Sequence, residues 1–114
     1  MSADAQRGLA DLAVQYWKLC QAFERELAFG DERRIASGEA TLRFARRRLD
    51  TILAEHEMRV ATFEGEAWTA ALPVIPINPD DITTAAASVD ATIEPTILGP
   101  ACTVAPGKVM LRNA

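Results

Sequence analysis

The chain has 114 residues, of which 49% are hydrophobic and 25% are charged, and its net charge is −4. This composition is typical of a soluble domain and excludes the disordered and membrane classes. A chain of this length forms one domain, or one elongated unit with an appendage. No apolar leader precedes the first predicted helix, and no apolar run approaches the ~18 residues of a membrane span, so we expect a cytoplasmic protein that does not bind membranes.

The charge is unevenly distributed along the chain. Residues 1–63 carry ten Lys/Arg and ten Asp/Glu, whereas residues 64–114 carry two Lys/Arg and six Asp/Glu. An acidic C-terminal part argues against nucleic acid as the main ligand, because phosphate neutralisation needs clustered cations.

A first amphipathic helix is predicted from about residue 4 to residue 28. Ser2 or Asp4 can cap its N terminus, and Gly30 suits its C-terminal stop. Its apolar residues recur at helical spacing and form one stripe. The stripe consists of Leu9, Leu12, Tyr16, Leu19, Phe23 and Leu27.

A second helix is predicted to begin between Asp31 and Ser37 and to continue to about Glu57. Residues spaced by sevens form a seam along which it can lie against another helix. The linker between the two helices is short, so they must run antiparallel. The seam consists of Ile35, Leu42, Leu49, His56 and Phe63, with Ala45 and Ile52 between them.

Two such helices cannot bury their apolar stripes within one chain, because each has only one neighbour. We therefore expect a second copy to supply the missing burial, which gives a homodimer with a four-helix bundle. The residues predicted at this interface are Leu12, Tyr16, Leu19, Phe23, Leu42, Leu49 and Ile52.

After Phe63 the sequence changes to short extended segments punctuated by prolines. Proline cannot donate a hydrogen bond to a sheet, so the proline-rich segment is predicted at a sheet edge. The fold class is thus α+β, with a helical hairpin at 1–57 and a small, mostly antiparallel β domain at 58–114; the conformation of residues 78–90 stays open. The predicted segments are a strand at 58–63, a turn at 64–66, an edge segment at 72–79, a loop at 80–87, and strands at 88–97 and 108–112.

We find no catalytic constellation and expect neither an enzyme nor a bound metal or cofactor. The single histidine, His56, either fixes the register of the seam or lies exposed at the helix end, and we favour the second interpretation. Cys20 and Cys102 lack metal-ligand spacing, and Cys20 is predicted to be a small buried hydrophobe. Phosphate-binding loops of the GxGxxG or GxxxxGK[ST] type do not occur.

The arginine run Arg46–Arg48, together with Arg43, invites a nucleic-acid interpretation. Consecutive helical residues point about 100° apart, so these side chains fan around the helix. We interpret the run as a solvated surface that is paired with nearby acids. The expected partners are Glu39, Asp50 and Glu55.

Trp68 follows the turn at Gly65 and has two interpretations. It is either an anchor for a partner or a plug at the junction between the helices and the β segment, and we favour the plug.

The order of short motifs resembles the GrpE family, the nucleotide-exchange factors of the bacterial Hsp70 chaperone DnaK. The segment Leu19–Leu27 is similar to the family's "DNLERAL"-like helix, Gly38–Ala40 to its "EGV" helix start, and Leu49–Leu53 to its "QLLDVL"-like stretch. Gly65–Trp68 resembles the "GEPFDP" turn, and Val104–Leu111 resembles the closing "LRPAxVxV" strand.

The chain also departs from this family. The long N-terminal helical stalk has no counterpart, Trp68 stands in place of phenylalanine, and Thr69–Pro73 replaces the "DPxxHEA" motif. The segment from Pro73 to Ala87 is peculiar to this chain, which indicates a divergent branch.

The resemblance implies a homodimeric co-chaperone whose β domain binds the open state of an Hsp70-family ATPase and promotes nucleotide exchange. The alternative is a non-enzymatic homodimeric adaptor or assembly protein that uses the helical bundle and an exposed β edge. The residues expected at the partner are Trp68, Glu94, Pro95, Pro106, Gly107 and Lys108.

Overall fold

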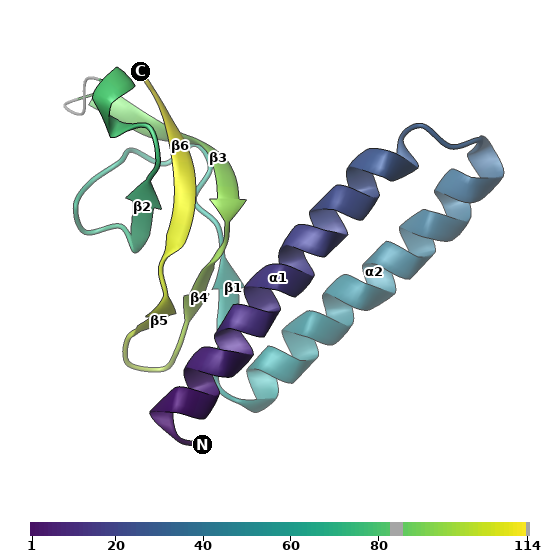
Figure 1. Cartoon of the computed structure of the whole chain (residues 1–114), viewed down its shortest axis with the longest axis horizontal. Helices are drawn as coiled ribbons and strands as arrows, with labels where there is room; N and C mark the ends of the chain where they lie inside the picture. Colours follow the sequence, from purple (N-terminus) through teal and green to yellow (C-terminus); the bar gives the residue numbers. More distant parts are fainter. Residues whose placement is uncertain (83–85, 114) are drawn as a thin grey trace. The chain divides into compact units, whose positions relative to one another are not determined.

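The chain forms two compact units, residues 1–57 and residues 58–114, in a computed structural model that describes residues 1–82 and 86–113. The first unit is a helical hairpin and the second, the β unit, consists of short strands (Figure 1). The predicted fold class, two helices followed by small sheets in an α+β fold, is confirmed.

Both helices of the hairpin begin at a side-chain cap. The Ser2 hydroxyl accepts a hydrogen bond from the backbone N–H of Ala5 (3.1 Å) before α1, which spans Ala3–Leu27. The Asp31 carboxylate accepts one from the N–H of Arg34 (2.8 Å) before α2, which spans Glu32–Glu55. Such caps satisfy N–H groups that the first helical turn leaves unpaired.

The two helix ends differ from the sequence prediction in detail. The C-cap of α1 is Ala28, in right-handed conformation, and not Gly30. The last residue of α2 is Glu55, and Glu57 lies beyond it with a positive φ of 59°. The helix therefore ends in a left-handed residue, which is a common way to stop a helix.

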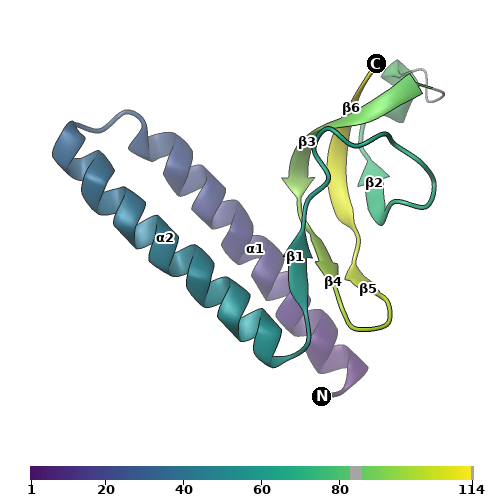
Figure 2. The same ribbon diagram turned by 180° about the vertical axis from the view of Figure 1, so that it is seen from behind.

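The two helices run antiparallel and side by side (Figures 1 and 2). The Tyr16 hydroxyl donates to the carbonyl oxygen of Ala45 (2.9 Å) across the hairpin. Nearer the interhelical turn, Gly38 is buried so closely against Leu27 that a Cβ at this position would overlap the leucine methyl groups. A small residue at Gly38 thus allows the backbones to approach.

The β unit contains two three-stranded sheets. The first has the order β1-β4-β5 and is antiparallel. The second has the order β2-β6-β3, in which β2 pairs parallel and β3 antiparallel to β6. The strands are β1 (Arg59–Ala61), β2 (Val74–Pro76), β3 (Ala87–Glu94), β4 (Thr96–Leu98), β5 (Thr103–Ala105) and β6 (Gly107–Asn113).

Two prolines mark the places where the chain passes from one sheet to the other. Pro95 separates β3 from β4, and Pro106 separates β5 from β6. Since proline has no N–H to donate, each one interrupts a ladder of hydrogen bonds at this place. The strand predicted at 88–97 is therefore two strands in different sheets, which is a correction to the sequence analysis.

The Thr96 hydroxyl joins the segments that meet at this crossing. It donates to the carbonyl oxygen of Pro73 (3.0 Å) and accepts from the N–H of Gly107 (3.1 Å). Thr96 is a buried polar residue, 1% exposed. One hydroxyl group thus links the beginnings of β2, β4 and β6.

The core of the second sheet consists of alternating residues of β3 and β6. Ala87, Val89, Val109 and Leu111 are buried together. This alternation is the period of two that a half-buried strand requires. Residues packed against this cluster are Phe63, Trp68, Leu72, Val74 and Ile82.

Some of the remaining segment predictions are confirmed, and the others differ or lie partly outside the described residues. The turn at 64–66 is confirmed, with Gly65 at a positive φ of 84°, and β2 is an edge strand as predicted. Of the loop predicted at 80–87, residues 83–85 lie outside the described residues, and Pro79–Asp81 form a short 3-10 helix. The strand β5 was not predicted, because three residues carry too little pattern.

Replacing Thr96 with valine removes the hydroxyl while keeping the side-chain shape. We expect Thr96→Val to lower the free energy of unfolding of the β unit by about 0.5–1.5 kcal/mol, because the hydrogen bonds of the hydroxyl are lost while the N–H of Gly107 still bonds to the carbonyl oxygen of Pro73. Thr96→Ser, which keeps the hydroxyl, should lower the free energy of unfolding by less. The control Thr103→Val, at an exposed position, should leave it nearly unchanged. Urea unfolding measures all three, and equal losses for valine and serine would contradict the role of the hydroxyl.

Candidate interaction surfaces

An apolar groove lies along one face of the helical hairpin. Its volume is about 240 Å³, and it is open to solvent. It is lined by Tyr16, Leu19, Cys20 and Phe23 of α1 and by Thr41, Leu42 and Ala45 of α2.

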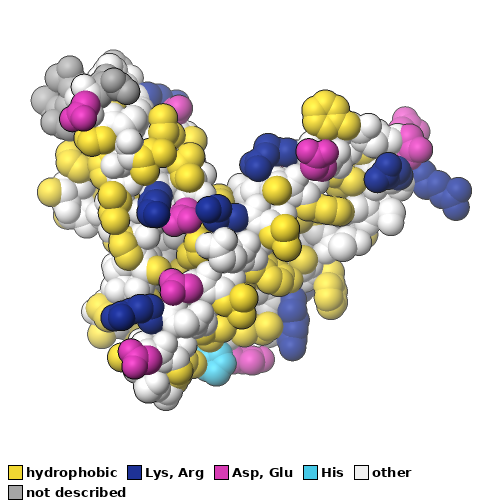
Figure 3. All heavy atoms as spheres, in the orientation of Figure 1, with side chains coloured by type: hydrophobic (Ala, Val, Ile, Leu, Met, Phe, Trp, Pro, Cys, Tyr) yellow, Lys and Arg dark blue, Asp and Glu magenta, His cyan; other side chains and the backbone are white. Residues whose placement is uncertain are grey.

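Three large apolar side chains of α1 are exposed, and two of them, Leu19 and Phe23, line the groove. Leu12 is 64% exposed, Leu19 is 71% exposed and Phe23 is 41% exposed. With Tyr16, these positions follow the spacing i, i+4, i+7 and i+11, which places them on one helix face. An apolar helix face with several exposed side chains is typical of an interaction site. In the space-filling view, hydrophobic side chains are visible along the hairpin (Figure 3).

The residues predicted at the dimer interface do not all lie at the surface. Leu42 and Leu49 are buried, at 5% and 8% exposure, and Tyr16 and Ile52 are half-buried. Leu42 lines the floor of the groove through contacts within one chain, so little of its surface is left for a second copy. The predicted interface is therefore divided between buried residues and the exposed face of α1.

A polar contact joins the two helices outside the groove lining. The Arg46 guanidinium donates to the Glu24 carboxylate (3.0 Å) and to the Gln21 side chain (2.7 Å). The hydrogen bond from Arg46, and then its positive charge, lower the pKa of Glu24. The run Arg46–Arg48 thus contributes one interhelical ion pair, and its partner is on α1 and not among the acids expected from sequence.

Cys20 is buried, as predicted. Burial raises the pKa of its thiol, and the positive charge of Arg46 opposes this effect only in part. A thiol with a raised pKa is a poor nucleophile, so Cys20 acts as a packing residue.

Among the residues predicted to bind a partner, Trp68 belongs to the core of the β unit. It packs against the buried cluster that includes Val89 and Val109. Its backbone N–H donates to the carbonyl oxygen of Ala87 (2.9 Å), which holds the turn against β3. The indole Nε1 is buried and has no hydrogen-bond partner within the described part of the chain.

The other five residues predicted to bind a partner come together where the chain crosses between sheets. Pro95 and Gly107 are buried, and Glu94 pairs with Lys108 in the register of β3 and β6. The Lys108 ammonium lies 3.5 Å from the Glu94 carboxylate. Only Glu94, Pro106 and Lys108 retain surface for a partner, since Glu94 is half-buried and the other two are exposed.

A second apolar surface lies on the outer face of the sheet β2-β6-β3. Ile75 is 48% exposed and Ile77 is 50% exposed. Val74 packs into the core, so the alternating side chains of Ile75 and Ile77 point away from it. Met110 lies between the buried residues Val109 and Leu111 and points to the same outer face. Ile75, Ile77 and Met110 form the apolar strip.

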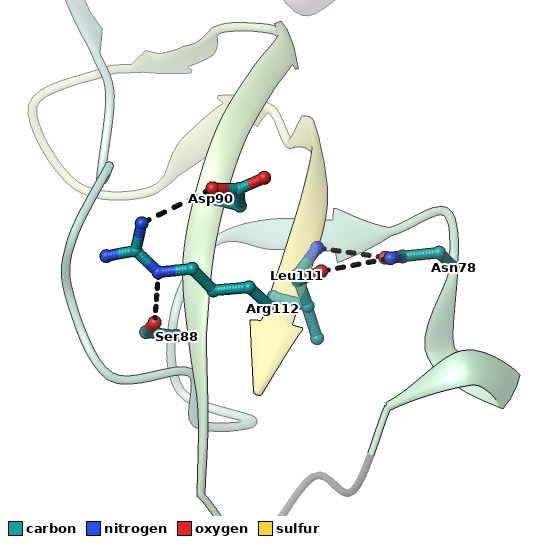
Figure 4. Close-up of polar contacts among 5 residues, drawn as sticks. All are labelled: Asn78, Ser88, Asp90, Leu111 and Arg112. Carbon is teal, nitrogen blue, oxygen red and sulfur yellow. Dashed lines mark hydrogen bonds and ion pairs between the residues drawn. The ribbon is translucent and has the colours of Figure 1, made fainter. Parts of the chain in front are cut away.

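Charged pairs flank the apolar strip on β6. The Arg112 guanidinium contacts Asp90 (3.3 Å) and donates to the Ser88 hydroxyl (3.2 Å), as Figure 4 shows. Lys108 contacts Glu94 at the other end of the strand. Both cations are therefore engaged by carboxylates of β3.

Asn78 extends the pairing of β2 with β6 by means of its side chain. Its amide nitrogen donates to the carbonyl oxygen of Leu111 (3.0 Å), and its amide oxygen accepts from the N–H of Leu111 (2.9 Å) (Figure 4). These two bonds replace a backbone pair that Pro79 cannot make. They fix the segment that carries Ile75 and Ile77.

The outer edge of β2 offers no backbone donor to another strand. The backbone carbonyl of Pro73 and the N–H of Ile77 bond to β6. In this parallel pairing the backbone groups of Val74 and Pro76 therefore point to the outer edge of the sheet. The N–H of Val74 is bonded to the carbonyl oxygen of Leu72 (2.8 Å), and Pro76 has no N–H. The extension of this edge by a partner strand, which the adaptor hypothesis assumes, is thus disfavoured.

The apolar strip was missed by the sequence analysis, although a signal was present. The side chains of the segment Val74–Ile77 alternate between the two faces of a strand, whereas its prolines indicate only that the strand lies at a sheet edge. Met110 can be assigned to this surface only from the register of β2 with β6, in which Ile75 pairs with Lys108 and Pro76 with Val109.

The described residues hold no cluster of metal-ligating side chains. Within residues 1–82 and 86–113, no group of three or more His, Cys, Asp or Glu side chains is placed to hold a metal ion. His56 is the exposed C-cap of α2, in agreement with the interpretation we favoured. Over the same residues, neither helix is apolar enough to cross a membrane.

Comparison with known protein families, with characterised proteins and with solved structures found no match to this chain.

A substitution at Gly107 tests how closely the segments pack where the chain crosses between the sheets. A Cβ at this position would lie 2.6 Å from the Thr96 hydroxyl oxygen and 2.8 Å from the Glu94 carbonyl oxygen. We expect Gly107→Ala to destabilise the β unit by about 1–3 kcal/mol through overpacking. The control Gly8→Ala in α1, where no atom lies within 4 Å, should not destabilise the protein. Thermal unfolding distinguishes the two, and a neutral Gly107→Ala would contradict the close approach.

The Glu24–Arg46 ion pair predicts an acid dependence of stability. Because the pKa of Glu24 is lowered on folding, the pair stabilises the protein above about pH 4.5 and the stabilisation is lost as the pH falls through the lower, folded value. The pair is largely exposed, so Glu24→Gln should cost only about 0.2–1 kcal/mol at pH 7. The two proteins should converge at pH 2, and a constant difference from pH 7 to pH 2 would contradict the assignment.

Proposed function

We propose that this protein is a cytoplasmic, non-enzymatic, GrpE-like co-chaperone that promotes nucleotide exchange on an Hsp70-family ATPase. The observation that carries the proposal is the uncovered apolar face of a two-helix hairpin, followed in the chain by a unit whose described residues form six strands. The resemblance described above implies the same order of parts.

The hairpin supports self-association. Leu12, Leu19 and Phe23 expose a continuous apolar stripe beside a groove that is itself apolar. Positions 12, 16, 19 and 23 carry no charge, so a second hairpin can cover this face without burying an unpaired ion. Two hairpins packed in this way form a four-helix bundle.

The β unit supports the role of the partner-binding part. Two segments with the family resemblance lie in ordered elements: Gly65–Trp68 pairs with β3, and Val104–Leu111 covers the end of β5 and most of β6. The segment peculiar to this chain, from Pro73 onward, contains β2 and the exposed residues Ile75 and Ile77.

Exchange by such a factor is mechanical and requires no catalytic residue. The dimer binds the opened, nucleotide-free form of the ATPase more tightly than the closed form, and the population shifts toward the open form, from which ADP leaves faster. A 100-fold preference corresponds to about 2.7 kcal/mol of differential binding. An interface of modest size supplies this difference.

Release of a fluorescent ADP analogue from an Hsp70 of the same cell tests the proposal. We expect saturating protein to accelerate release about 10-fold or more, in line with the coupling energies of two-state systems. Unchanged release at saturating concentration would end the proposal.

The exposed face of α1 tests dimerisation separately. Leu19→Asp places a charge on this face, and because Leu19 is exposed the hairpin should still fold. Sedimentation should show a dimer for the wild type and a monomer for Leu19→Asp, with helical circular dichroism retained. The control Phe29→Asp, at an exposed site beyond the end of α1, should stay dimeric. A monomeric wild-type protein at micromolar concentration would remove the four-helix bundle.

A non-enzymatic homodimeric adaptor remains the second candidate. It is favoured by the same hairpin face, but the edge of β2 lacks the donors needed for strand addition. Recovery of a stable structural partner and no ATPase in a pull-down would select it.

A further inference from the structure

The outward side of α2 is strongly basic. Residues 33–48 contain six Arg and one Glu, a balance of +5, although the whole chain carries −4. Successive helical residues point about 100° apart, so six exposed side chains of this segment share the side opposite to the buried Leu42 and Leu49. They form the basic face, which carries no Asp or Glu. It consists of Arg33, Ala36, Ala40, Arg43, Phe44 and Arg47.

The arginines of the basic face lack the acidic partners that the sequence predicts. Within the part of the chain that the structure describes, the guanidinium groups of Arg33, Arg43 and Arg47 form no ion pair. Arg43 and Arg47 are four residues apart on the helix, a spacing at which like charges repel each other. An anionic ligand bound between them removes this repulsion, so the basic face favours a negatively charged partner.

Phe44 places an exposed aromatic ring among these charges. The residue is 70% exposed, and the small Ala40, one turn before it, leaves the ring uncovered. Proteins that bind single-stranded nucleic acids combine cations along the phosphate backbone with aromatic rings on which the bases stack. Arg43 precedes Phe44 directly and Arg47 follows it after three residues, so the basic face offers both elements side by side.

Other anionic partners fit the basic face less well. A helix that lies on an anionic membrane inserts a broad apolar side, and a protein partner needs an apolar centre of several large side chains. The basic face has one large apolar side chain, Phe44, beside two alanines. In a duplex the bases are stacked on one another, so the ring of Phe44 finds no free base. A single strand uses both the arginines and the ring.

We infer that the basic face of α2 binds a single strand of nucleic acid. The three arginines contact its phosphates, and Phe44 stacks on a base. From Arg33 to Arg47 the face extends about 21 Å along the helix, enough for several nucleotides. Because the chain as a whole is acidic, nucleic acid is a weak, second ligand, with an expected Kd of about 1–100 μM at physiological salt. The basic face contains none of the residues predicted at the dimer interface, so this binding does not depend on the proposed function.

Fluorescence anisotropy of the full chain with a labelled single-stranded RNA of about 20 nucleotides tests the arginines. We expect Arg43→Gln/Arg47→Gln to raise the Kd at least 10-fold at 50 mM salt, because two phosphate contacts are lost. The matched control Arg7→Gln/Arg25→Gln removes the same charge from exposed sites of α1, and its Kd should change less than 3-fold. Equal losses for the two double variants would show an effect of net charge alone and overturn the site.

The salt dependence counts the phosphate contacts. Three contacts predict that raising the salt from 50 to 200 mM weakens wild-type binding about 20-fold, whereas one remaining contact predicts about 3-fold for Arg43→Gln/Arg47→Gln. The same salt dependence for both proteins would contradict contacts at these two arginines.

Phe44 separates a single strand from other polyanions. Phe44→Ala should raise the Kd about 5-fold or more through the loss of stacking, and Phe44→Tyr should bind like the wild type. The residue is exposed, so helical circular dichroism should be retained. An unchanged Kd for Phe44→Ala, equal binding of the duplex RNA, displacement by poly-glutamate at equal charge, or no binding by the wild type at 1 mM would each overturn the inference.

Discussion

The β unit is held together, at the place where its chain changes sheets, by one side-chain hydroxyl group and one backbone hydrogen bond. Two prolines end the ladders of β3 and β5, and the residues that follow them, Thr96 and Gly107, begin the next strands. At this crossing the N–H of Gly107 donates to the carbonyl oxygen of Pro73 (3.2 Å), and the Thr96 hydroxyl adds a second hydrogen bond to each of these two groups. Gly107 leaves the space that the hydroxyl occupies.

The helical hairpin obeys a different constraint, which is that one helix face can contact only one neighbour. Gly38 and the Tyr16 hydroxyl bring the two helices close enough to bury Leu42. The adjoining face of α1, with Leu12 and Leu19, stays in water. A surface for association thus arises next to the intramolecular seam.

How far the candidate surfaces could be predicted depends on the residues in question. The apolar stripe of α1 was visible in the sequence because helical spacing alone defines a face. The sequence did not separate exposed Leu19 from buried Leu42, since both occupy apolar positions of amphipathic helices. Trp68 and Gly107 are a further example. Motif similarity assigned both to a partner-binding surface, whereas in the fold they pack inside the β unit.

Local chemistry in the sequence by itself determined the two helices, the cap at Asp31 or nearby, the turn at Gly65 and the edge position of the proline-rich segment. These features depend on contacts between residues close in the chain. Only the tertiary structure decided that Pro95 sends the chain into a second sheet, and that Ile75, Ile77 and Met110 share one surface. Both outcomes follow from strand register, which is set by hydrogen bonds between distant segments and leaves no local pattern in the sequence.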